Sequence, residues 1–181
     1  MGLHKIHVPK GEFWDERKRE FVYTKETTLK LEHSLISIAK WESKWHIPYL
    51  SSEKTNEQAL DYVRCMTLNP DVDPNVYLRL TVDDIKELKE YIEDPMTATT
   101  IKDDGRKTGS GQRITAELVY YWMTQFNIPI EFEKWHFNRL ITLIRVCAEE
   151  SNPNKKMSKA EAARSMREIN AARRAKYNTK G

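Results

Sequence analysis

The sequence predicts an α+β fold, mainly α, with short N-terminal strands followed by a bundle of about four to five helices and a basic C-terminal helix. Three observations lead to this fold class. Residues 1–50 contain short segments typical of extended structure, and within them Thr27–Glu32 alternates with the period of two that strands require. Residues 55–150 carry apolar stripes at helical spacing. Residues 151–181 are rich in Lys and Arg but poor in apolar side chains.

We expect one globular domain over residues 1–150 and a separate helical arm over residues 151–181. Within the domain, residues 1–50 would be extended and β-rich, and residues 55–150 helical. A Gly-, Ser- and charge-rich stretch at 102–112 predicts a flexible loop. With 181 residues, including five Trp, eight Tyr and five Phe, the chain is long and aromatic enough to bury a core.

The N-terminal part contains one clear strand and one ambiguous segment. Thr27–Glu32 alternates as a half-buried strand should. Ser34–Trp45 fits two structures. It can form a short buried strand, or a helix with Leu35, Ile38, Glu42 and Trp45 on one face, and Pro48 ends it in either case.

Two helix starts carry capping signals. Thr55 and Gln58 match a capping box, in which each side chain satisfies a backbone N–H at the helix start. Thr81 is a natural N-cap with Asp84 at the third helical position. The helix after Thr81 is expected to bury Ile85, Leu88 and Ile92.

Two further helices are predicted at 115–127 and 133–149. Residues 115–127 are apolar nearly all round, which indicates a helix at the centre of the core. The connection between the two helices is short, which favours antiparallel packing of one against the other. The residues expected to be mostly buried in this pair are Trp122, Phe126, Phe137, Leu140 and Ile144.

Charge is distributed unevenly along the chain. Residues 151–181 contain nine Lys or Arg and two Glu, a net charge of +7; because the whole chain carries +3, residues 1–150 carry −4. Ser158–Glu161 matches a capping box, but the apolar face that follows is thin. We therefore interpret this segment as a partner-binding arm. Its candidate contact residues are Lys155, Lys156, Lys159, Arg164, Arg167, Arg173, Arg174 and Lys176.

No motif for catalysis or metal binding emerges. The chain lacks a P-loop, a GxGxxG after a strand, GxSxG and HExxH. His4 and His7, three apart in a predicted strand, should point to opposite faces. Asp71 and Asp73 lack the Gly and Glu of a calcium loop and are interpreted as turn residues. We expect no enzyme activity, no cofactor and no metal.

The cysteines and the apolar runs bear on where the protein resides. Cys65 and Cys147 have no partner at ligand spacing, so we expect free buried thiols in a reducing compartment; a disulfide or a catalytic thiol is the alternative. No apolar run reaches the roughly 18 residues of a membrane helix, and no secretory signal is apparent. These features predict a cytosolic protein without a membrane partner.

Several long segments resemble the tail assembly chaperones of tailed bacteriophages and their prophages. The similarity extends over residues 28–181. The segments that carry it are Leu31–Trp45, Asp61–Thr67, Asp94–Thr100, Ile114–Met123, Glu133–Leu140 and Ala171–Gly181.

The resemblance implies a function in assembly. Such chaperones are thought to bind the long helical tape-measure protein, to recruit tail-tube subunits and to be absent from the finished particle. It implies no catalytic residues, no cofactor and a location in the host cytoplasm, with possible self-association. One alternative is a structural component of the phage neck or tail that stays in the virion. A second is a nucleic-acid-binding protein that uses the basic C-terminal helix, although the acidic body disfavours nucleic acid.

Overall fold

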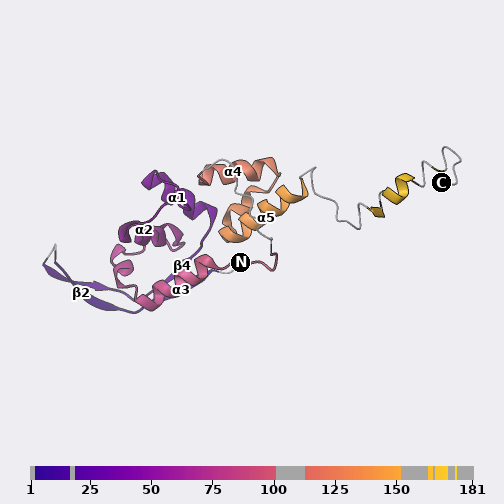
Figure 1. Cartoon of the computed structure of the whole chain (residues 1–181). Coiled ribbons are helices and arrows are strands. Elements are labelled where there is room, and N and C mark those ends of the chain that lie inside the picture. Colours follow the sequence, from indigo (N-terminus) through magenta and orange to yellow (C-terminus); the bar gives the residue numbers. More distant parts are fainter. Residues whose placement is uncertain are drawn as a thin grey trace. The chain divides into compact units, whose positions relative to one another are not determined.

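The structure is a computed structural model that confirms the predicted α+β, mainly helical class (Figure 1). It describes residues 3–16, 19–100 and 113–151, together with 163, 164, 166–170 and 174. The elements are β1 (His4–Val8), β2 (Gly11–Asp15), β3 (Glu20–Thr24), β4 (Thr27–Leu31), α1 (Leu35–Trp45), α2 (Asn56–Met66), the 3-10 helix η1 (Pro74–Arg79), α3 (Val82–Glu93), α4 (Ala116–Gln125), the 3-10 helix η2 (Ile130–Lys134) and α5 (Phe137–Glu150).

The chain forms two compact units, Met1–Val146 and Cys147–Gly181. The division falls within α5, slightly before the boundary that we expected after residue 150. The loop predicted at 102–112 and the capping box predicted at Ser158–Glu161 lie outside the described residues.

The four strands form one long antiparallel ribbon. β1 pairs with β4, and β2 pairs with β3. The register is unbroken between the two ladders, since Val8 faces Thr27, Gly11 faces Thr24, and two residues separate these pairs in each strand. Within each ladder, side chains alternate between the two faces of the ribbon.

The inner half of the ribbon is one wall of the core. Ile6, Val8, Leu29 and Leu31 lie on one face and are at most 2% exposed. The outer half, β2 and β3, reaches beyond the helices (Figure 1). The expectation of extended structure is therefore correct for residues 4–31.

The ambiguous segment after the ribbon is a helix, so the expectation of a β-rich chain up to residue 50 is wrong for α1. The Ser34 N–H donates to Ser37 Oγ at 2.9 Å at the helix start. His46 adopts a left-handed conformation with φ of 55° and ends the helix. The buried residues of α1 are Leu35, Ser37, Ile38, Trp41 and Glu42.

Both predicted caps are confirmed, but the inward face of α3 differs from the prediction. Thr55 and Gln58 exchange hydrogen bonds at the start of α2, and Thr81 and Asp84 do so at the start of α3. α3 buries Leu88 and Tyr91, Ile92 only partly, and leaves Ile85 45% exposed. The helix is turned so that the Tyr91 hydroxyl accepts the buried His33 N–H at 3.2 Å.

The predicted pairing of the last two helices is wrong. α4 packs mainly on α1, and it buries only Ala116, Val119 and Met123. Trp122 and Phe126 are half-buried, whereas Phe137, Leu140 and Ile144 are buried as expected.

The reason lies in the connection between these helices. Residues 130–134 form η2, so the second helix begins at Phe137 rather than at residue 133. The Phe137 N–H then donates to the His33 carbonyl at 2.8 Å, which places the start of α5 against the junction of β4 and α1.

Glu42 links α1 to the nearby Tyr49 and to the start of α4, which is distant in sequence. This carboxylate is 8% exposed. Oε1 accepts the Tyr49 N–H and Oε2 accepts the Ala116 N–H, both at 2.7 Å. Ala116 is the first residue of α4, whose N–H has no partner within the helix. Glu42 therefore holds the start of α4 against α1.

Replacing Glu42 by Gln should lower the free energy of unfolding by about 1–3 kcal/mol, because the new NH₂ group would face a backbone N–H that loses its acceptor. Chemical denaturation measures this change. Glu53→Gln, at an exposed position, is the control and should have little effect. Equal stability of the two variants would contradict the role of Glu42.

Leu140 is fully buried in α5, at 0% exposed. Leu140→Ala should lower the free energy of unfolding by about 2–5 kcal/mol through lost burial and a residual cavity. Ile130→Ala is the comparison, since Ile130 is 55% exposed. A thermal midpoint of Leu140→Ala equal to that of the parent would place the core elsewhere.

Candidate protein-binding surface

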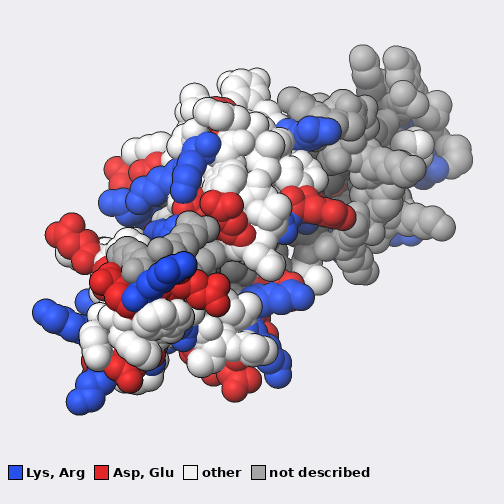
Figure 2. Space-filling model, turned by 90° about the vertical axis from the view of Figure 1, so that its left-hand side faces the viewer, with Lys and Arg blue, Asp and Glu red and all other residues white. Residues whose placement is uncertain are grey.

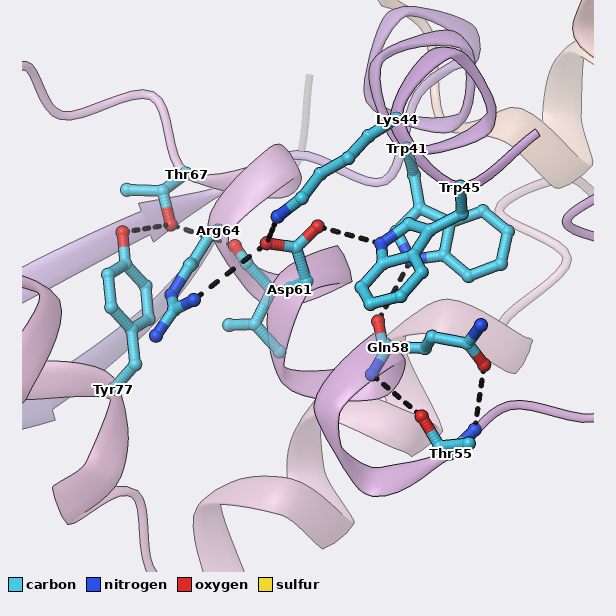
Figure 3. A network of polar contacts seen from close by, with 10 residues as sticks. Trp41, Lys44, Trp45, Thr55, Gln58, Asp61, Arg64, Thr67 and Tyr77 are labelled. Atoms are coloured by element: carbon cyan, nitrogen blue, oxygen red, sulfur yellow. Dashed lines mark hydrogen bonds and ion pairs between the residues drawn. The ribbon is translucent and has the colours of Figure 1, made fainter. Parts of the chain in front are cut away.

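Asp61 is a buried carboxylate that links α2 to α1 (Figure 3). Asp61 is 4% exposed. It accepts from Lys44 Nζ at 2.5 Å and from Trp45 Nε1 at 2.9 Å, and Arg64 Nη1 lies 3.8 Å away. These partners join α1 to α2 and balance the buried charge. Both oxygens of the Asp61 carboxylate are therefore bound to other groups of the fold.

His33 is the second buried polar centre, and its surroundings keep it neutral. Its ring is buried against the rings of His136 and Phe137, with centroids 5.0 and 5.7 Å away. His33 Nδ1 and the Tyr62 hydroxyl lie 2.5 Å apart. Burial, and secondarily His136, lower the pKa of His33 to about 3. The neutral, enclosed imidazole thus packs between side chains of α2 and α5.

His136 lies beside a small cavity. Its Nε2 is 2.9 Å from the Tyr91 carbonyl, whereas its Nδ1 is buried without a hydrogen-bond partner. The cavity has a volume of about 80 Å³ and is also lined by Tyr91, Met96 and Arg139. That volume admits a few waters rather than a typical small-molecule ligand.

The other residues that were considered as metal ligands from the sequence lie in a strand or a turn. His4 is half-buried and stacks on Tyr91, with centroids 5.0 Å apart, while His7 is exposed. Asp73 accepts the Asn75 N–H at the start of η1, as expected of a turn residue. Within the described ranges, no group of three or more His, Cys, Asp or Glu could hold a metal ion.

Both thiols are free. Cys65 and Cys147 are only partly buried, in contrast to the full burial that we expected. Burial, and secondarily Asp61, raise the pKa of the Cys65 thiol, which keeps it protonated near neutral pH.

The outer half of the ribbon exposes an aromatic face formed by Trp14, Phe21 and Tyr23. These side chains are 50%, 56% and 72% exposed. Trp14 faces Phe21 in the register, and their rings meet edge to face with centroids 5.1 Å apart. On these two strands the aromatic face is the exposed one, since the other face carries the partly buried Phe13 and Val22 and the buried Thr24.

The opposite face of the ribbon is held to the body by Arg79 of η1. Arg79 Nη1 donates to the Pro9 carbonyl at 2.5 Å and to Thr24 Oγ1 at 2.9 Å. The guanidinium lies so close to Gly11 that an added Cβ would displace it. Phe13 and Val22, on this same face, are partly buried. The clamp fixes the base of β2 and β3 and leaves the aromatic face open.

The outer part of the ribbon, residues 10–26, has no net charge. Residues 10–26 contain five Lys or Arg and five Asp or Glu. On the side of the molecule seen in Figure 2, positive and negative side chains are interspersed without a broad area of one sign. A nucleic-acid backbone would require a positive surface, so the aromatic face is better suited to protein.

The predicted contact residues of the basic arm are only partly described. Arg164, Arg167 and Arg174 are helical and exposed. Met166 and Ile169, which belong to the thin apolar stripe, are 59% and 44% exposed. The other predicted contact residues, Lys155, Lys156, Lys159, Arg173 and Lys176, lie outside the described residues.

Sequence reasoning missed the aromatic face. A signal for it exists, because Trp14, Phe21 and Tyr23 stand at alternate positions on either side of a strongly charged turn. Alternation shows which side chains of a strand share a face, but it does not show which of the two faces the rest of the fold covers.

Comparison of the chain with protein-family models, curated proteins and solved structures finds no match. Across the described segments, no helix has the length and apolarity needed to span a bilayer.

The depressed pKa of His33 predicts acid sensitivity. An unfolded His titrates near 6.5, whereas folded His33 titrates near 3, so the unfolded chain binds the extra proton between these values. Stability should be fully present above about pH 6.5 and fall by about 1.4 kcal/mol per pH unit below it. Denaturation at pH 7 and pH 5 should show a smaller decline in His33→Gln than in the parent or in exposed His7→Gln. Equal declines in all three would contradict the assignment.

Proposed function

We propose that the protein is a non-enzymatic binding module for phage tail assembly, and that its aromatic face contacts a tail protein. The observation that carries the binding role is the exposure of Trp14, Phe21 and Tyr23 on a clamped ribbon. Large aromatic side chains contribute much of the binding energy in protein interfaces. Holding them on a strand pair reduces the ordering entropy that binding would otherwise require.

The phage context rests on the resemblance of residues 28–181 to tail assembly chaperones. It implies two partners, the tape-measure protein and the tail-tube subunits. The basic arm would add electrostatic attraction, because its charge of +7 accelerates encounter with an acidic partner surface. The aromatic face would then supply direct contact, and the basic arm would supply long-range attraction.

The aromatic face can be tested with Trp14→Ala/Phe21→Ala. The variant should bind the tape-measure or tube protein at least tenfold more weakly, since truncating an interface aromatic typically costs more than 1 kcal/mol. Co-purification from infected cells and phage yield provide the readouts. Tyr121→Ala is the matched control, because Tyr121 on α4 is 56% exposed. Unchanged binding by a folded double variant would refute this role.

The basic arm has a separate signature. Arg173→Glu/Arg174→Glu should slow association mainly at low ionic strength, and added salt should reduce the difference from the parent. Stopped-flow association with the tail partner at several salt concentrations measures this effect. Identical rates at low salt would show that the arm does not steer binding.

The virion-structural alternative makes a different prediction. A chaperone should be absent from mature particles, whereas a neck or tail component would be abundant there. Mass spectrometry of purified virions separates the two, and abundant peptides of this chain would reject the chaperone proposal.

A further inference from the structure

Residues 66–69 run along the edge of β4 and form one β-bridge with it, between Leu31 and Thr67, and we call this segment the third strand. The Glu32 N–H donates to the Met66 carbonyl at 2.9 Å, and the Leu68 N–H donates to the Lys30 carbonyl at 2.8 Å. The next residue continues the pattern with its side chain. Asn69 Oδ1 accepts the Lys30 N–H at 2.7 Å, and Asn69 Nδ2 donates to the Thr28 carbonyl at 3.1 Å.

Pro70 ends this third strand. Proline lacks an N–H and cannot continue a ladder of hydrogen bonds. Beyond Asn69 the chain turns away through Asp71, which has a φ of 52°. The ribbon itself continues outward to β3 in the same register. Residues 66–69 therefore cover the edge of β4 but do not reach the edge of the ribbon at Lys25 and Tyr23.

A groove of about 430 Å³ opens where the third strand ends, and we call it the edge groove. One wall is the outer ribbon and the other is the turn before η1. The lining residues are Tyr23, Lys25, Thr27, Asn69, Pro70, Asp71, Val72, Asp73 and Val76. Tyr23 belongs both to the edge groove and to the aromatic face, so the two surfaces are continuous.

The walls of the edge groove have a definite chemistry. Asp71 and Asp73 contribute two negative charges and Lys25 one positive charge. Val72 is partly buried and, together with Tyr23, offers apolar contact. A strand bound here would present alternate side chains to these walls.

We propose that the edge groove binds an extended segment of the partner protein, which adds to β3 as a strand in line with residues 66–69. The segment carries an apolar side chain for Tyr23 and Val72 and a Lys or Arg for Asp71 and Asp73. Main-chain hydrogen bonds to the edge of β3 that residues 66–69 leave uncovered supply affinity, and the groove walls select the sequence. This inference rests on the proposed protein-binding function and specifies the form of the partner.

The test uses the full chain and a display library of random ten-residue peptides. Selected peptides should alternate apolar residues with Lys or Arg. On binding, amide hydrogens of residues 20–26 should exchange more slowly, as expected for a newly paired strand. Failure to select binders, or selection of peptides that leave this exchange unchanged, would overturn the proposal.

Asp71→Asn/Asp73→Asn removes the charge with little disturbance of the fold, because Asn tolerates positive φ at position 71 and can still cap at position 73. It should weaken the selected peptides about tenfold at low salt. Asp83→Asn/Glu90→Gln on α3 removes the same charge elsewhere and should leave affinity unchanged. If both double variants bound the peptides equally weakly, the effect would come from net charge alone, and the assignment to the edge groove would be wrong.

The outcomes separate the two proposals. If tail-protein binding requires Trp14 and Phe21 but no peptide occupies the edge groove, strand addition is wrong and the proposed function stands. If peptides bind the edge groove but a tail protein binds equally well without Trp14 and Phe21, the aromatic-face role is wrong and strand addition stands.

Discussion

The unbroken register between residues 4–15 and 20–31 is the constraint on which the rest of the domain depends. A slip of one residue would exchange the faces of the ribbon and expose Ile6 and Leu29. The inner half gives the helices an apolar wall to cover. The outer half extends the same hairpin past them and leaves Trp14, Phe21 and Tyr23 exposed.

Buried polar groups hold the helices to this wall. Glu42 ties α4 to α1, Asp61 ties α1 to α2, and His33 lies among side chains from α2 and α5. Each group is satisfied mainly by other parts of the fold, since an unpaired buried polar atom is costly. The large apolar side chains that the outer ribbon exposes are instead Trp14, Phe21 and Tyr23.

Local signals in the sequence predicted local structure well. The Thr55 and Thr81 caps need only neighbours in the chain, and both formed as expected. The prediction for α4 was wrong because an apolar composition does not show which side a helix packs on, and Tyr121 is 56% exposed. The aromatic face was missed for a related reason. Which face of β2 and β3 the rest of the fold covers is a long-range property, set by contacts such as that of Arg79 with Thr24.

The size of the aromatic face constrains how it can work. Its three side chains expose roughly 300–450 Å² between them, given the 150–250 Å² of a whole aromatic side chain. A standard stable interface buries about 800 Å² per partner. The aromatic face alone therefore supports brief contacts, and added contact in the edge groove would be needed for a lasting complex. Because the two surfaces meet at Tyr23, a partner could engage the aromatic face first and then add a strand. Losing either contact would return the complex to weak binding, which is what the proposed assembly role would require for release of the partner.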